Sequence, residues 1–165
     1  MSASRSGRGR GTRAPTRVRE GTATPPLTVL YVESSALVAA WLESDTAVKR
    51  ALDAPGRRIT SAITFTEARR AVLRARMTER ITAAQAATAL KGLPAQAARC
   101  QVVAVTEEVL LRAGQAFPVE PVRTLDAIHL ATLELLALRP EATKVLTRDA
   151  RVAANARALG YMVSD

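Results

Sequence analysis

Aromatic residues are scarce in this chain of 165 residues, which has one Trp, two Tyr and two Phe. The side chains available for a core are therefore mostly small and aliphatic. Cys100 is the single cysteine, so no internal disulfide can form, and we expect a reduced, cytoplasmic setting. No apolar run approaches the length that spans a bilayer, and the N-terminus lacks the apolar segment of a secretory signal. We therefore expect no association with a membrane.

Acidic residues are almost absent from the first 26 residues. This segment has six arginines against Glu20, a balance of +5 out of the formal net charge of +9, and is otherwise mostly Gly, Ser, Thr and Pro. Such a composition predicts a disordered basic tail over 1–26, followed by one folded domain over 27–165. The tail either adds non-specific affinity for nucleic acid or is a dispensable extension.

Short β-branched runs alternate with longer alanine-rich stretches after the tail. Strands are expected at 28–32, 57–61, 101–105, 144–147 and 161–163. Helices are expected at about 35–42, 45–53, 63–77, 82–98, 106–116, 124–137 and 150–159. Thr82, Thr106 and Thr124 are typical N-cap residues, and Gly160 is typical of the position after a helix. This alternation predicts a three-layer α/β sandwich, in which helices cover both faces of a parallel five-stranded sheet.

Glu33 stands between the buried strand 28–32 and the apolar helix that follows it. A charge is costly there unless something pairs with it. Asp149 likewise follows the fourth strand, and parallel sheets bind ligands beyond the carboxyl ends of their strands. Capping the next helix would account for Asp149, but Glu33 fits a plain cap poorly, since Ser34 and Ser35 follow it and would serve better.

Two further carboxylates occupy the starts of helices. Glu67 borders the apolar face of the helix 63–77, and Asp126 opens a helix that is apolar nearly all round. Either acid alone could complement a helix dipole. Four carboxylates at one edge of a sheet repel one another, however, and a hard divalent cation such as Mg²⁺ relieves that repulsion. Such a site supports hydrolysis of a phosphodiester by metal-activated water, which would leave a 5′-phosphate and a 3′-hydroxyl.

Two other features have a plain structural interpretation that we favour. His129, the only histidine, lies one turn after Asp126, and a hydrogen-bonded core histidine is a better interpretation than a general base. The arginines between 69 and 80 predict a solvated helix face, with a phosphate-binding surface beside Glu67 as the alternative.

Four segments together resemble the PIN domain, and specifically the VapC-type toxins of toxin–antitoxin systems. They are "LYVESSALV", "ITSAITFTEARRAV", "RTLDAIHLATLELL" and "VLTRDARVAANARALGYMV", which span about Leu27 to Val163. The resemblance implies a sheet of order 3-2-1-4-5 and a ribonuclease that depends on Mg²⁺ or Mn²⁺. It also implies a homodimer and inhibition by a cognate antitoxin.

The resemblance also assigns roles to individual residues. The four family acids correspond to Glu33, Glu67, Asp126 and Asp149. By similarity Glu33, Asp126 and Asp149 bind the metal, whereas Glu67 positions water or a second ion. The supporting hydroxyl residues are Ser35 and Thr147, and Arg123 stands where relatives often have a basic residue.

The first acid of the family is most often aspartate, and here it is glutamate. With the longer side chain, the metal must shift, the side chain must fold back, or the occupancy of the metal site falls. Two other functions therefore stay open. One is a catalytically weakened module that binds RNA or an antitoxin, and the other is a nucleic-acid-binding protein that acts through its basic tail.

Overall fold

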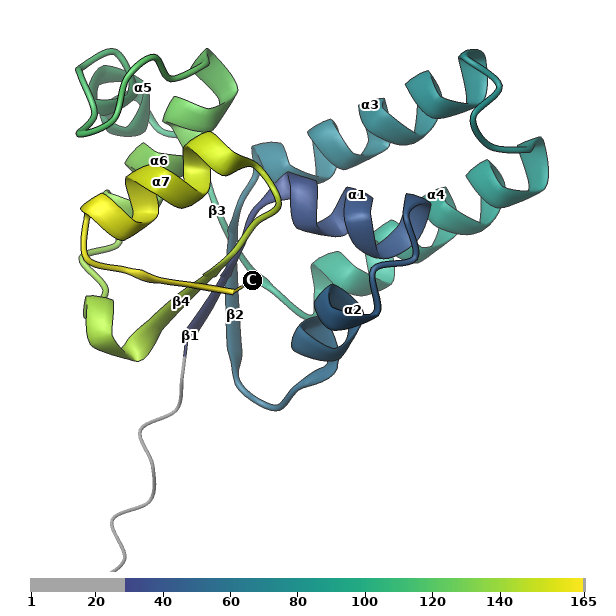
Figure 1. Cartoon of the computed structure of the whole chain (residues 1–165), viewed down its shortest axis with the longest axis horizontal. Helices are drawn as coiled ribbons and strands as arrows, with labels where there is room; N and C mark the ends of the chain where they lie inside the picture. The colour runs from purple at the N-terminus through teal and green to yellow at the C-terminus, as the bar shows by residue number, and fades with distance from the viewer. Residues whose placement is uncertain (1–28, 165) are drawn as a thin grey trace, which may run out of the picture.

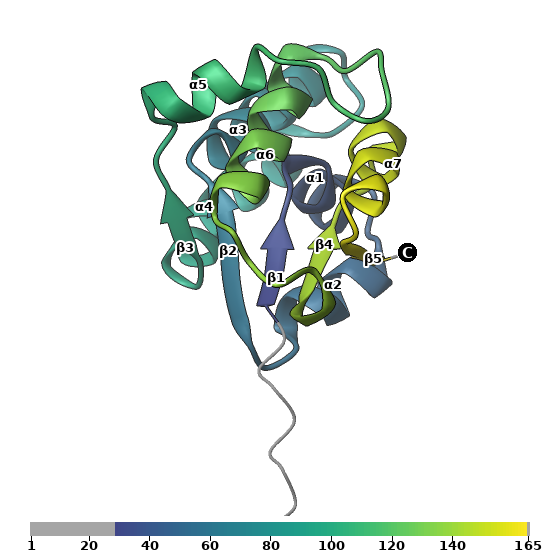
Figure 2. The ribbon, with the colours of Figure 1, turned by 90° about the vertical axis from the view of Figure 1, so that its left-hand side faces the viewer.

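The sheet has five strands, all parallel, in the order β3-β2-β1-β4-β5 (Figure 2). A computed structural model describes residues 29–164, so the expected tail lies outside the described residues. The strands are β1 (Val29–Val32), β2 (Arg57–Ser61), β3 (Gln101–Val103), β4 (Thr143–Leu146) and β5 (Met162–Ser164). The expected sandwich and strand order are both confirmed.

Seven α-helices cover the two faces of this sheet within the described residues (Figure 1). One side has α1 (Ser34–Leu42), α2 (Thr46–Asp53), α3 (Ile63–Met77) and α4 (Ala83–Ala98). The other side has α5 (Glu107–Ala113), α6 (Thr124–Leu135) and α7 (Ala150–Ala158), and a 3₁₀ turn over Pro140–Ala142 precedes β4. None of these helices in residues 29–164 is long and apolar enough to cross a membrane.

The central strand β1 is buried on both faces. Val32 packs with Leu37 and Ala40 of α1, whereas Tyr31 packs on the opposite face with Leu133 of α6. All five residues of these two contacts have 1% or less of their surface exposed. Because both sides of β1 are covered, any polar group at its end is held in a defined position.

Helices α3 and α4 form an antiparallel pair that extends beyond the sheet (Figure 1). Val72 and Ala75 of α3 lie on the buried side, where Val72 packs against Ala86 and Ala89 of α4. The remaining surface of α3 is largely solvent-exposed. This pair therefore presents one face of α3 beside the carboxyl edge of the sheet.

The expected ends of the elements needed small corrections. Thr82 and Thr106 cap α4 and α5 as predicted, but Thr124 is the first residue of α6 rather than its cap. The helix expected over 106–116 ends at Ala113 because the turn at Gly114 stops it. The edge strand β3 ends at Val103, two residues early, because β2 pairs with it only from Ile59 to Ser61.

Candidate active site

The candidate site lies at the carboxyl end of the central strands. The chain passes from β1 to β2 on one side, and β4 lies on the other side of β1, so the strand order reverses here. Open parallel sheets bind ligands at such a reversal. Glu33 directly follows β1, Asp149 lies in the loop after β4, and α3 and α6 bring Glu67 and Asp126 to this edge.

Glu33 is buried, with 3% of its surface exposed, and occupies the N-cap position of α1. Its two carboxylate oxygens accept the backbone amide of Ser35 at 3.1 and 3.0 Å. The hydroxyl of Ser34 donates to Oε1 at 2.5 Å, while the hydroxyls of Ser35 and Thr147 donate to Oε2, that of Thr147 at 2.8 Å. The expectation that the serines would replace Glu33 as cap is wrong, because both serines donate to the glutamate, which folds back over its own helix start.

Two hydroxyl groups join the hinge after β1 to the loop after β4. Ser35 Oγ accepts the backbone amides of Arg148 and Asp149 at 2.7 and 3.1 Å. Thr147 Oγ1 also accepts the amide of Asp149, at 3.1 Å, and lies 3.2 Å from Ser35 Oγ. Both residues predicted to support the site therefore lie in it, where they hold Glu33 and the start of α7 together.

His129 lies between two of the predicted acids, with 1% of its surface exposed. Its Nε2 is 2.6 Å from Oε2 of Glu67 and 3.8 Å from Oε1 of Glu33. On the other side of the ring, the Tyr31 hydroxyl lies 3.4 Å from Nδ1 and donates to the His129 carbonyl at 3.0 Å. Burial, and then the charge of Glu33, raises the pKa of Tyr31, so this hydroxyl stays protonated. The expected hydrogen-bonded core histidine is confirmed, but its partner Glu67 belongs to the site.

Arg151 lies between the other two predicted acids. Its Nε is 3.4 Å from Oδ2 of Asp126, and its Nη2 is 3.6 Å from Oδ2 of Asp149. Asp149 also caps α7, since its Oδ1 accepts the amides of Arg151 and Val152 at 2.7 and 3.2 Å. Burial and the nearby charge of Asp149 raise the pKa of Asp126, although Arg151 opposes this effect. The negative charge at this edge is therefore only partly compensated by the protein itself.

Arg123 does not join this cluster. It is exposed at the N-cap position of α6, and across residues 29–164 its side chain makes no hydrogen bond or ion pair. The resemblance assigned a basic residue to this place, and the structure puts Arg123 at the start of α6, three residues before Asp126.

The donor groups suit a divalent cation. One oxygen each from Glu33 and Glu67 and a ring nitrogen of His129 lie within 4.8 Å of one another. Asp126 and Asp149 lie outside this group of three, on either side of Arg151. Burial, and then the charges of Asp149 and Glu33, raise the pKa of Asp126, so a nearby cation would favour its ionised form. Carboxylate oxygens are the donors that Mg²⁺ and Mn²⁺ prefer, and an imidazole nitrogen suits transition ions better than Mg²⁺.

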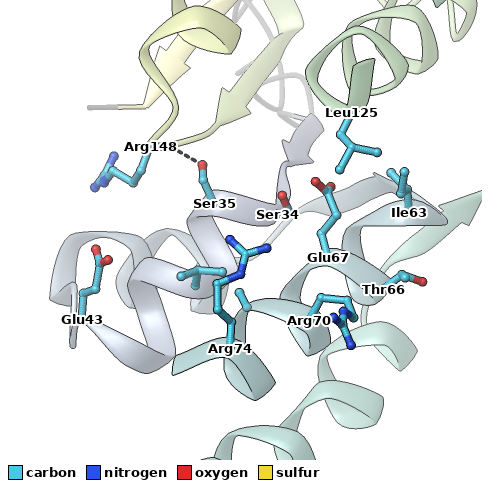
Figure 3. Close-up of a pocket in the computed structure, with 12 residues that line it drawn as sticks. Ser34, Ser35, Glu43, Ile63, Thr66, Glu67, Arg70, Arg74, Leu125 and Arg148 are labelled. Atoms are coloured by element: carbon cyan, nitrogen blue, oxygen red, sulfur yellow. Dashed lines mark hydrogen bonds between the residues drawn. The ribbon is translucent and has the colours of Figure 1, made fainter. Parts of the chain in front are cut away.

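A pocket of about 560 Å³ opens beside the acids, between α1 and α3 (Figure 3). Glu67 and the arginines Arg70, Arg74 and Arg148 line it, together with Ser34, Ser35 and Glu43. Val38, Ile63, Ala71 and Leu125 form its apolar wall, and Thr66 completes the lining. The pocket thus joins acidic, basic and apolar surface at the edge of the sheet.

The sequence match and this geometry agree on the class of protein. The model of the PIN domain family matches residues 30–158. The chain therefore belongs to the PIN domain family. A search of curated proteins gives no significant match.

Solved structures share this fold at low sequence identity. VapC20 of Mycobacterium tuberculosis, a sarcin–ricin loop cleaving toxin, matches with a TM-score of 0.58 and 16% identity over 81% of this chain and 96% of its own. A toxin–antitoxin complex from Klebsiella pneumoniae matches with a TM-score of 0.53 and 18% identity, over 76% and 90%. A protein from Pyrobaculum aerophilum matches with a TM-score of 0.54 and 20% identity, over 83% and 91%.

Sequence reasoning missed Arg151, and it placed His129 in the core without linking it to Glu67. His129 falls three residues after Asp126 on α6, so helical spacing alone was a signal that the two face the same side. Arg151 falls two residues after Asp149 in the first turn of α7, where nothing in the local sequence distinguishes it from a solvated arginine. Its contact with Asp126 depends on how α6 and α7 pack.

Proposed function

We propose that this chain is a metal-dependent endoribonuclease that acts as the toxin of a toxin–antitoxin pair. The observation that carries the proposal is that two pairs of acids lie at the strand-order reversal of a PIN domain: Glu33 and Glu67 meet at His129, and Asp126 and Asp149 meet at Arg151. Two of the solved relatives are, by their descriptions, a toxin and a toxin–antitoxin complex. RNA is the substrate in this proposal, and the net charge of +9 favours a polyanion.

In this mechanism Glu33, Asp126 and Asp149 would hold Mg²⁺ or Mn²⁺. When bound, the ion supplies a Lewis acid that activates water and offsets charge on the scissile phosphate. Glu67 is oriented by the 2.6 Å contact of its Oε2 with His129, which leaves Oε1 to accept the proton of the attacking water. The water oxygen bonds to phosphorus as the bond to the 3′ oxygen breaks, and that oxygen takes up a proton from solvent water, which gives a 5′-phosphate and a 3′-hydroxyl. Ser35 and Thr147 keep Glu33 in place during this reaction.

The partners follow from the same proposal. A cognate antitoxin holds the enzyme inactive, the active form is a homodimer, and both proteins work in the cytoplasm. The family resemblance supports the dimer, and the Klebsiella pneumoniae complex supports the antitoxin. The single cysteine supports a reducing compartment.

The test is cleavage of RNA by the purified chain. Cleavage should require Mg²⁺ or Mn²⁺, stop with chelator, and fall at least about 100-fold in Asp126→Asn, because one ligand and its charge are lost. Glu141→Gln is the matched control, since Glu141 is an exposed carboxylate at the amino end of β4, and it should cleave like the parent. Metal-independent cleavage, or full activity of Asp126→Asn, would overturn the proposal.

A second function is favoured by one observation, the saturation of Glu33. Its carboxylate already accepts one amide and three hydroxyl groups. A module with a weakened metal site would bind RNA or an antitoxin without cleaving. Calorimetric titration separates the two, because this module would take up neither Mg²⁺ nor Mn²⁺. Deleting residues 1–26 tests the third alternative, in which only the tail binds nucleic acid.

A further inference from the structure

We propose that Arg70 and Arg74 of α3 form a track for the RNA backbone, which binds the phosphates that follow the scissile one. The inference rests on the proposed function for the identity of the ligand and adds where that ligand lies. Its basis is the arrangement of charges along one face of α3.

Glu67, Arg70 and Arg74 are spaced three and four residues apart, so they share one face of the helix. The rise of an α-helix separates them by about 4.5 Å and about 6 Å along the axis. All three line the pocket beside the site, and Arg74 reaches toward the space between Ser34 and Glu67 (Figure 3). An RNA strand that is held at the acids by one phosphate and runs beside α3 therefore has two cations of this helix within the same pocket.

The guanidinium groups of α3 have no partner in the part of the chain that the structure describes. All four arginines of the helix (Arg69, Arg70, Arg74 and Arg76) are exposed, and across residues 29–164 none makes an ion pair or side-chain hydrogen bond. Arg148, on the same pocket, differs: it donates to Asp45 at 2.8 Å and to the Ser164 carbonyl at 3.1 Å. Like charges four residues apart destabilise a helix, so the Arg70–Arg74 pair has a cost that bound phosphates would remove.

The opposite wall of the pocket suits a nucleotide base. Val38 of α1 and Leu125 of α6 lie on it, and Leu125 is 44% exposed, while Ile63 adds apolar surface at the start of α3 itself. Single-stranded RNA can turn unstacked bases toward apolar side chains while its phosphates contact arginines. Glu43, the pocket's second acid, lies across from Arg70 and Arg74 at the far rim (Figure 3), which confines the backbone to the α3 side. These features favour a single-stranded polynucleotide over an acidic polypeptide.

The experiment measures binding of a short labelled oligouridylate by fluorescence anisotropy, in chelator and over a series of salt concentrations. The full chain carries Asp126→Asn in every sample so that no cleavage occurs. Arg70→Gln/Arg74→Gln is compared with Arg69→Gln/Arg76→Gln, which removes the same charge from the opposite face of the same helix. The first pair should weaken binding by about tenfold or more and reduce the slope of log K against log salt by about 1.4, since each contact to single-stranded phosphate contributes about 0.7.

Three outcomes would overturn the track. The first is unchanged oligouridylate binding in Arg70→Gln/Arg74→Gln, and the second is an equal loss in this variant and in Arg69→Gln/Arg76→Gln. The third comes from the same assay with labelled polyglutamate: Arg70→Gln/Arg74→Gln weakens polyglutamate binding more than oligouridylate binding. The last would assign the groove to an acidic polypeptide. Failure of the proposed function is distinguishable, because cleavage and binding are measured separately. A chain that does not cleave RNA can still bind it, and the comparison of the two double variants then tests the track alone.

Discussion

Replacing Glu33 by glutamine should destabilise the metal-free protein, although it removes one of several mutually repelling carboxylates. The side chain keeps its length and volume, so the substitution changes only charge and hydrogen bonding. Glu33 accepts from the Ser35 amide and from the hydroxyls of Ser34, Ser35 and Thr147. In the glutamine variant, the side-chain NH₂ group would replace one of the two carboxylate oxygens and would face groups that donate hydrogen bonds. The hydroxyl groups on that side would have to rotate so that they accept a hydrogen bond from the NH₂ group.

The magnitude follows from those four donors. A hydrogen bond to a charged group contributes about 1.5–3 kcal/mol and a neutral one about 0.5–1.5, so each bond weakens by about 1 kcal/mol when the charge is lost. Relief of repulsion with Asp126 offsets part of the total. We expect a net loss of about 2 kcal/mol in the free energy of unfolding, which lowers Tm by about 4–8 °C for a domain of this size.

Thermal and urea unfolding in chelator would measure the effect, with Asp126→Asn as the comparison. Asp126 has a raised pKa despite Arg151, so its ionised form is disfavoured in the folded state, and Asp126→Asn should not lower Tm at neutral pH. We therefore expect a lower Tm for Glu33→Gln and no decrease in Tm for Asp126→Asn. If Glu33→Gln were as stable as the parent, the charge of Glu33 would add nothing to the hydrogen bonds around it, and the expected loss of about 2 kcal/mol would be wrong.

Two further predictions concern the same cluster. First, the raised pKa of Asp126 means that the folded state favours the protonated carboxyl. Its contribution to the free energy of unfolding is therefore fully present below the ordinary aspartate pKa of about 3.9, and it is lost as pH rises through the raised pKa. The metal-free parent should thus lose some stability over that window, and Asp126→Asn should lose less when Tm is followed against pH. Second, His129→Leu should slow RNA cleavage about 10–100-fold at saturating metal, because Glu67, the proton acceptor of the attacking water, loses the group that orients it. His129→Gln keeps a donor near the Nε2 position and should recover part of that rate, and equal rates in all three proteins would rule out a positioning role.

Local sequence signals were sufficient for most of the fold. The β-branched residues of β1, the capping threonine Thr82 and the turn at Gly160, whose φ is +88°, each act within a few residues. These short-range preferences predicted where strands and helices occur, and their alternation predicted the parallel sheet. The strand order came from the family resemblance, since no local signal says which strands pair.

The site was predictable in its acids but not in its contacts. Glu33 and Asp149 stood out because charges at strand ends are unusual, and both lie at the expected edge. The folded-back position of Glu33 depends on Thr147, and the environment of His129 depends on Tyr31 and Glu67, residues 62 to 114 positions apart in the sequence. Such contacts depend on how the elements pack, which neither periodicity nor capping rules encode.

The central place of β1 in the sheet has a consequence for the order in which the site forms during synthesis. Val29 pairs with Thr143, and Glu33 bonds to Thr147, 114 residues later. A ribosome releases β1, β2 and all helices through α6 before it releases β4, so the nascent chain holds Glu33 without its clamp and lacks Asp149 altogether. A domain that closes its sheet with a late strand completes its tertiary structure only after that strand has been released. An RNA-cutting activity built in this way would switch on only after β4 and the loop that holds Thr147 and Asp149 have been released.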